Sequence, residues 1–145
     1  MGASKIQLSA SLGEKFKVQT TVRGNTVCID QPPEAGGTNA GLNPLETTLF
    51  ALSGCIAHIG RIVAMQKKLA IRAMQIEVEG EIDKDFLLGK TQTGRAGFTK
   101  ISARVKIDAD LTPEQKKEFL HEVERRCPVS DNLANPTTVD VALAE

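Results

Sequence analysis

Polar and apolar residues alternate in two short segments of the N-terminal third, and such alternation is typical of a strand with one face on a core. Residues 5–10 alternate, and residues 16–22 alternate more regularly. An Arg-Gly-Asn turn at 23–25 separates the second segment from a short run at 26–30 that is rich in strand-forming residues. Turn chemistry between two such segments predicts a β-hairpin.

A loop rich in Pro, Gly and Asn at 31–44 leads into a long segment with helical spacing. Asn43 can cap this helix, and Pro44 suits its first turn. The helix is apolar nearly all round, which is typical of a buried central helix or of a membrane span. Arg61, His58 and Glu46, with several Gly, Ser and Thr, leave a stretch too short and too polar for a span, so we expect the buried helix. We therefore expect a central helix of about six turns, covered by sheet or by a second subunit.

The C-terminal half alternates again, which predicts strands at 74–83, 100–110 and 137–144, with a loop or irregular edge between the first two. A capping box formed by Thr112 and Gln115 predicts a helix between the last two strands. Strands, a helix, strands, a helix and a strand make an α+β fold. Because no linker or repeat interrupts the chain, we expect one domain over 1–145.

Composition excludes several partners. The chain has 18 basic and 18 acidic residues, five Phe, and no Trp or Tyr. No net charge recruits nucleic acid, and no aromatic platform stacks bases. The first residues lack the apolar stretch of a signal peptide, and three widely spaced cysteines do not form a disulfide scaffold. We expect a cytoplasmic protein that binds neither nucleic acid nor membrane.

Two cysteines are candidates for chemistry. Cys55 lies in the apolar helix, and a cysteine in such a place is more often a packing residue than a nucleophile. Cys127 lies between a helix end and Pro128, so it can be the N-cap of a further helix. Amide donors and the helix dipole at an N-cap favour a thiolate, and Arg125 and Arg126 add positive charge. Cys127 is therefore the stronger candidate on local chemistry alone.

A metal site is a second reading. Cys55 and His58 share a helix face at i, i+3, and Cys127 could be a third ligand. Zinc sites usually show paired ligands on both sides, so this pattern is weak, and His58 is as readily a core residue. Cys28 in the predicted hairpin is interpreted as a packing residue. No phosphate-binding or dinucleotide motif is complete, so we expect no cofactor and no resident metal.

Two stretches together resemble the OsmC/Ohr family, the osmotically inducible and organic hydroperoxide resistance proteins. They are PPEAGGTNAGLNPLETTLFALSGC at 32–55 and RRCPVSDNL at 125–133. The residues that match the family pattern are Asn43, Pro44, Glu46, Cys55, Cys127 and Pro128. In the best-studied branch a Glu directly follows Asn-Pro, whereas Leu45 stands there in this chain. The chain is thus more similar to the less characterised OsmC-like branch.

The resemblance implies an intertwined homodimer with antiparallel sheets around a long buried central helix, and sites at the subunit interface. It also implies a thiol peroxidase. Cys55 would attack an organic or inorganic hydroperoxide and become a sulfenic acid, and Cys127 would resolve it as a disulfide. A small thiol or a lipoyl-bearing protein would be the reductant.

The same resemblance implies that an Arg and a Glu activate the reactive cysteine. Glu46 is the candidate carboxylate, although its one-residue shift makes a capping role equally open. Arg23 in the early hairpin is the first choice of arginine and Arg61 the second. Two alternatives remain open at this point. One is a non-catalytic stress protein that binds a metal or a small ligand at the dimer interface, and the other is a protein whose cysteines only pack.

Overall fold

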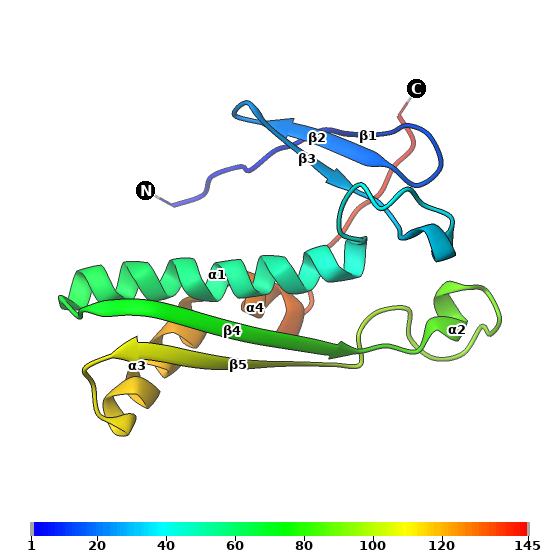
Figure 1. Ribbon diagram of the computed structural model, residues 1–145. Helices are drawn as coiled ribbons and strands as arrows, with labels where there is room; N and C mark the ends of the chain where they lie inside the picture. The colour runs from blue at the N-terminus through cyan, green and yellow to red at the C-terminus, as the bar shows by residue number, and fades with distance from the viewer. Residues whose placement is uncertain (1, 145) are drawn as a thin grey trace. The chain divides into compact units, whose positions relative to one another are not determined.

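The computed structural model describes residues 2–144, which divide into two compact units (Figure 1). The boundary between them in the sequence lies between Thr48 and Leu49. The first unit holds three strands, a short 3₁₀ helix and the first turn of the long helix α1. The second holds the rest of α1, two long strands and three further helices. Each unit is described here by itself.

The first unit is a three-stranded antiparallel sheet of β1 (Ala10–Leu12), β2 (Val18–Val22) and β3 (Asn25–Ile29), in that order. Arg23 and Gly24, which join β2 to β3, both have positive φ angles, as a tight two-residue hairpin turn requires. The predicted hairpin is therefore confirmed.

The expected strand at 5–10 is wrong, because only its last residue belongs to β1. Ile6 and Leu8 are 96% and 64% exposed. No backbone ladder pairs with residues 5–9 in the described part of the chain. An alternating pattern gives a segment a preference for a strand, but the strand forms only when an edge is available to it.

The loop that follows β3 is organised around the buried carboxylate of Asp30. This group accepts hydrogen bonds from the backbone amides of Gln31, Thr38 and Ala40, and from the Thr38 hydroxyl at 2.6 Å. The Thr38 hydroxyl and the amides outweigh the opposing effect of burial and lower the pKa of Asp30 to about 2. The loop contains a 3₁₀ helix at Pro33–Ala35. Hydrogen bonds to the ionised Asp30 carboxylate thus hold the loop in its closed conformation.

Two glycines permit this loop closure. A Cβ atom on Gly37 would collide with the carbonyl oxygen of Gln31, and one on Gly41 would collide with that of Cys28. Glycine is needed at both places because another backbone passes too close for any side chain.

The helix α1 spans Pro44–Lys67, close to the length expected from the sequence. Asn43 caps it as predicted, since its Oδ1 accepts from the Glu46 amide at 2.8 Å while the Glu46 carboxylate accepts from the Asn43 amide at 3.0 Å. This reciprocal pair is a capping box.

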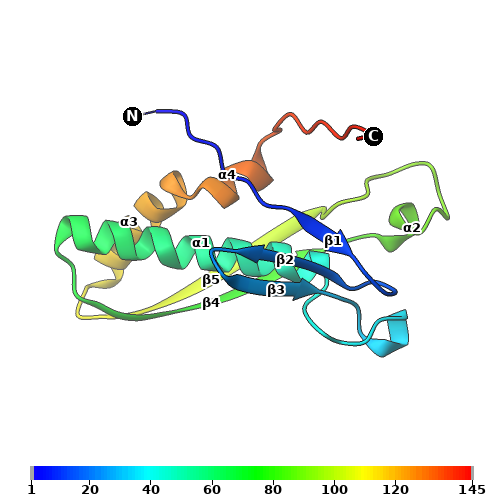
Figure 2. The same ribbon diagram turned by 90° about the horizontal axis from the view of Figure 1, so that it is seen from above.

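In the second unit, β4 (Ile71–Glu81) pairs antiparallel with β5 (Lys100–Ala109), and α1 lies along this two-stranded sheet (Figures 1 and 2). The helix α3 (Pro113–Arg126) begins with the predicted capping box of Thr112 and Gln115. The short helix α4 (Pro128–Ala134) follows after one residue. The segment between the strands, expected to be loop, contains the one-turn helix α2 (Lys84–Leu87).

The core of this unit joins α1, both strands and α3. Its buried members are Leu52, Ile56, Val63, Ala64, Ile71, Ile107, Ala109, Phe119, Val123 and Cys127. Gly60 of α1 lets the helix approach the sheet closely, because a Cβ there would come within 2.8 Å of the Met74 sulfur. Deleting a buried apolar side chain from such a core costs about 2–5 kcal/mol.

Only one side of α1 is buried within this unit. Phe50, Ile62 and Met65 are 66%, 42% and 71% exposed. By length and hydropathy alone α1 could cross a membrane, contrary to the expectation that its polar residues exclude this, but core helices of soluble proteins meet the same criteria. Leu52, Ile56 and Val63 lie in the core, as expected of a central helix.

The expected strand at 137–144 is also wrong, since these residues have no regular secondary structure. Val139, Val141 and Leu143 are 78%, 93% and 98% exposed. The alternation is present, but this segment pairs with neither β4 nor β5 in the described chain.

The Asp30 carboxylate gives a prediction for pH-dependent stability. Its pKa lies below the ordinary 3.8, at about 2. Its stabilising effect is therefore complete above about pH 4 and is lost as the pH falls toward 2. Asp30→Asn should lower the Tm at neutral pH, because an amide NH₂ would face backbone donors. Glu34→Gln, at an exposed position of the same loop, is the control. An unchanged Tm in Asp30→Asn would contradict this account of the loop.

Candidate functional site

The structure brings Cys55 and Cys127 together, although they lie far apart in the sequence. Cys55 comes from the middle of α1, and Cys127 from the junction of α3 and α4. Their side chains lie close enough for Cys55 to influence the Cys127 thiol, and all three cysteines are free. Cys127 is 1% exposed, whereas Cys55 is half-buried. Both belong to the second unit, so the pair is formed within one compact body.

The α3–α4 junction is built to hold Cys127 in place. Cys127 has an extended backbone, with φ −79° and ψ 110°, which ends α3 and starts α4. Its amide donates to the carbonyl oxygen of Glu124 at 3.4 Å, and its carbonyl oxygen accepts from the Asp131 amide at 3.0 Å. Pro128 at the first position of α4 has no amide hydrogen to satisfy. With one residue between two helices, the Cys127 thiol has little freedom to move.

The predicted N-cap position of Cys127 is confirmed, but the expected thiolate character is wrong. Burial raises the pKa of Cys127, and the hydrogen bond with Cys55 raises it further. The backbone amides of Ser130 and Val129 act in the opposite direction and do not prevail. Desolvation thus outweighs the helix N-terminus, and Cys127 keeps its proton to a pH above the ordinary range. Its S–H group is then available to donate to the Cys55 sulfur.

Glu46 and Arg23 lie in the first unit. The Glu46 carboxylate is engaged in the cap of α1. Arg23 is exposed in the turn between β2 and β3. Neither of them forms an ion pair with any residue among 2–144. Their predicted partnership with Cys55 joins residues of different units and stays a prediction.

The remaining candidates do not join the cysteine pair. Arg61 donates to the carbonyl oxygen of Ile71 at 2.9 Å and so ties α1 to the start of β4. His58 is exposed, and Cys28 belongs to β3 of the first unit. Within the described residues no three His, Cys, Asp or Glu side chains gather in a way that could hold a metal. The metal site considered for Cys55, His58 and Cys127 is therefore not formed among the described residues.

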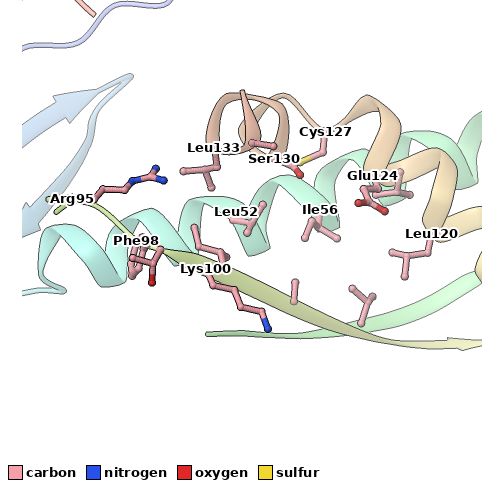
Figure 3. A pocket seen from close by; sticks show the side chains of 16 residues that line it. Leu52, Ile56, Arg95, Phe98, Lys100, Leu120, Glu124, Cys127, Ser130 and Leu133 are labelled. Atoms are coloured by element: carbon pink, nitrogen blue, oxygen red, sulfur yellow. The ribbon is translucent and has the colours of Figure 1, made fainter. Parts of the chain in front are cut away.

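A cavity of about 380 Å³ reaches Cys127 (Figure 3). Its walls come from α1, β5, α3, α4 and the segment before β5, and they expose polar and apolar surface in nearly equal parts. The apolar residues are Leu52, Ile56, Phe98, Ile101, Ala103, Val105, Leu120, Val123, Leu133 and Ala134. Three charged residues, Arg95, Lys100 and Glu124, also line it, and Cys55 does not. The site is thus a thiol pair with a cavity of mixed polarity on the Cys127 side.

Sequence reasoning missed Arg95, Phe98 and Glu124. Glu124 could have been found, because it lies one helical turn before Cys127. Phe98 could not, since its position depends on Gly80 of β4. A Cβ on Gly80 would lie 2.6 Å from Cδ1 of the Phe98 ring, so the ring rests on the bare strand backbone there. Arg95 lies in a segment whose sequence has no regular pattern.

The match to a family model settles the relationship. The family described as OsmC-like protein matches residues 37–142, which is more than half of the chain. The chain belongs to this OsmC-like family. The family match covers Cys55, Cys127 and every residue that lines the cavity.

Individual OsmC-like relatives agree with this assignment. The chain is 22% identical over 129 residues to a hydroperoxide reductase of Mycoplasma genitalium, covering 89% of this chain and 86% of the relative. The OsmC-like protein of Mycoplasma pneumoniae has a similar fold, with a TM-score of 0.78 at 22% identity, covering 92% and 89% of the two chains. An organic hydroperoxide resistance protein OsmC from Legionella pneumophila gives a TM-score of 0.66 at 19% identity, covering 92% and 91%. These structures show that the α+β fold is the OsmC/Ohr fold.

The raised pKa of Cys127 predicts its alkylation behaviour. In a Cys28→Ala background, the rate of Cys127 alkylation by iodoacetamide should rise with a midpoint above the ordinary thiol pKa of 9.0. Adding Cys55→Ala should move the midpoint down, because the contribution of Cys55 to the raised pKa of Cys127 is removed. Peptide mass spectrometry separates the two cysteines. A midpoint below the ordinary value would refute the role assigned to burial.

Proposed function

We propose that this protein is a thiol-dependent peroxidase that reduces organic or inorganic hydroperoxides through Cys55 and Cys127. The observation that supports it is the proximity of the two thiols, because a disulfide cycle needs two sulfurs that can bond with little movement. The hydroperoxide reductase among the relatives supports the same activity.

The two thiols have different parts in this cycle. The Cys55 thiolate attacks the terminal oxygen of the hydroperoxide, the O–O bond breaks, and the alkoxide leaves as an alcohol once it is protonated. Cys55 is then a sulfenic acid. Cys127 attacks the Cys55 sulfur, its proton leaves with the hydroxide as water, and a disulfide forms. Two electrons from an external thiol, either small or carried on a lipoyl-bearing protein, restore both cysteines.

Cys55 is assigned the attack because of the environments of the two sulfurs. Cys127 is 1% exposed and holds its proton, so it is poorly placed to meet peroxide first. Cys55 is the more accessible of the two. We further propose that Arg23 polarises the hydroperoxide and that Glu46 orients Arg23. This part of the proposal is supported by the family resemblance, since neither side chain forms an ion pair among residues 2–144.

We infer that the working form is a homodimer in the cytoplasm. In the second unit, apolar side chains that would suit an interface are exposed, including Phe50 and Met65 of α1 and Val141 and Leu143 near the C-terminus. An alternating segment such as 137–144 needs a sheet edge, and a second copy of the chain supplies one. The same surfaces account for the apolar character of α1 without a membrane.

A second candidate is a non-catalytic protein that binds a small ligand. The cavity of about 380 Å³ favours it, because cavities of this size suit small organic molecules. This candidate predicts binding that does not depend on the redox state of the cysteines.

The Cys55 assignment is tested with single substitutions. Cys55→Ser should lower the rate of cumene hydroperoxide reduction about a thousandfold or more, since the nucleophile is removed. Cys127→Ser should still react once and leave a sulfenic acid that dimedone traps. Cys28→Ser is the matched control and should keep full activity. If Cys55→Ser consumes peroxide as fast as the unaltered protein, the proposal fails.

The dimer is tested by sedimentation. The unaltered protein should have a mass twice that of one chain. Val141→Asp should raise the dimer dissociation constant at least about tenfold, because burying a valine is worth about 1.5–3 kcal/mol. Asp140→Asn, on the adjacent residue, should leave it unchanged. A monomer at all concentrations would exclude this interface.

A further inference from the structure

The end of α3 is attached to α1 by a polar side chain as well as by the buried core. Arg126, the residue directly before Cys127, donates from its Nη1 atom to the side-chain oxygen of Gln66 at 2.9 Å. Gln66 belongs to the last turn of α1 and lies about three turns after Cys55. The α3–α4 junction is therefore fastened to α1 at two places, at the cysteine pair and at Gln66.

Arg126 and its neighbour Arg125 make different contacts. The Arg125 guanidinium donates to both carboxylate oxygens of Glu122 in its own helix, at 2.8 and 2.9 Å, and its side chain is 63% exposed. The Arg126 side chain is 31% exposed, and its Nη1 atom lies 3.8 Å from the same carboxylate. The hydrogen bonds from Arg125, with the charges of both arginines, lower the pKa of Glu122. Of the two arginines, Arg126 alone donates a hydrogen bond to α1 within residues 2–144.

The position of Arg126 matters because it lies in the last turn of α3. The last carbonyl groups of a helix have no partner within the helix, and its last turn frays readily. Phe119 and Val123 hold the body of α3 in the core. Arg126 holds the turn that follows them, directly before the extended backbone of Cys127. Without this hydrogen bond, the turn that carries Cys127 would be free to pivot about its buried residues.

We propose that Arg126 is a positioning residue for disulfide formation, because its hydrogen bond to Gln66 holds the α3–α4 junction where the Cys127 sulfur meets the Cys55 sulfenic acid. The inference rests on the proposed function. In this step a bond forms between the two sulfurs, the S–O bond of the sulfenic acid breaks, and the hydroxide leaves as water with the Cys127 proton. The earlier cleavage of the O–O bond takes place at Cys55 and does not involve the junction.

Position and charge are separable causes. A cation near a thiol favours the thiolate, so the charge of Arg126 is an alternative explanation for any effect of its removal. Gln66→Ala removes the hydrogen bond and keeps the charge, whereas Arg126→Ala removes both. Alanine is a good helix former, so both variants keep their helices. A positioning role predicts the same defect in the two variants.

The first test measures the two chemical steps separately in a Cys28→Ala background. Protein is mixed rapidly with one equivalent of cumene hydroperoxide, and dimedone labelling and disulfide formation are followed by peptide mass spectrometry. Gln66→Ala and Arg126→Ala should each slow disulfide formation about tenfold, as expected when a hydrogen bond from a charged group no longer orients the reacting thiol. Consumption of peroxide in the first turnover should be unchanged.

Arg125→Ala is the matched control, because it removes an arginine from the same turn and leaves the bond to Gln66. Its disulfide should form at the unaltered rate. If Gln66→Ala forms the disulfide as fast as the unaltered protein, or Arg125→Ala is as slow as Arg126→Ala, the proposal is overturned.

The second test is a double-mutant cycle. Two side chains that act through one shared hydrogen bond give non-additive effects. The Gln66→Ala and Arg126→Ala double variant should therefore be about tenfold slower than the unaltered protein, like either single variant. A double variant slower by about a hundredfold would show two independent effects and would contradict the assigned bond.

The third test does not use peroxide. The fraction of Cys55–Cys127 disulfide is measured at equilibrium in glutathione buffers. Both single variants should shift the equilibrium constant about tenfold toward the dithiol, because a loose junction lowers the effective concentration of Cys127 near Cys55. If this shift is found and the unaltered protein consumes no peroxide, the proposed peroxidase function fails and the positioning role stands. If neither variant shifts the equilibrium, the positioning role fails whatever the peroxidase result.

Discussion

Burial of the Cys127 thiol against α1 is the constraint on which the second unit depends. Phe119, Val123 and Cys127 recur at four-residue intervals, and all three are buried. The apolar stripe of α3 therefore ends in a sulfur atom. The packing that forms the core also delivers the thiol to Cys55, so the geometry of the pair is as rigid as the core itself. The cost is electrostatic, because the same burial disfavours a charge on Cys127.

The parts of the fold that follow from local signals could be predicted. Asn43 and Thr112 cap their helices through side chains three residues away, and Pro128 begins α4, so these helix starts are readable from short stretches. The segments 5–10 and 137–144 have the right alternation and are not strands in the described chain. A strand depends on a partner edge, and alternation alone carries no information on where that edge is.

In the candidate site, too, the features that depend on local sequence could be predicted, and those that depend on distant residues could not. Periodicity places Cys55 on a helix and Cys127 at a helix start, but it contains nothing that brings the two together. That pairing could be expected only from the resemblance to a family. The thiolate expected at Cys127 was wrong because the N-cap position is local and readable, whereas burial depends on α1, which is distant in sequence. Arg95 has no local pattern and becomes a candidate only through the cavity.

The contact between Gly80 and Phe98 limits which substitutions these two positions can accept. The Phe98 ring occupies the space of any side chain at position 80, and it also forms part of the cavity wall. A lineage that gains a side chain at position 80 must lose or turn the ring at position 98. Neither position can drift alone without altering the chamber beside Cys127. Packing therefore couples the two positions, although one belongs to a strand and the other to an irregular segment.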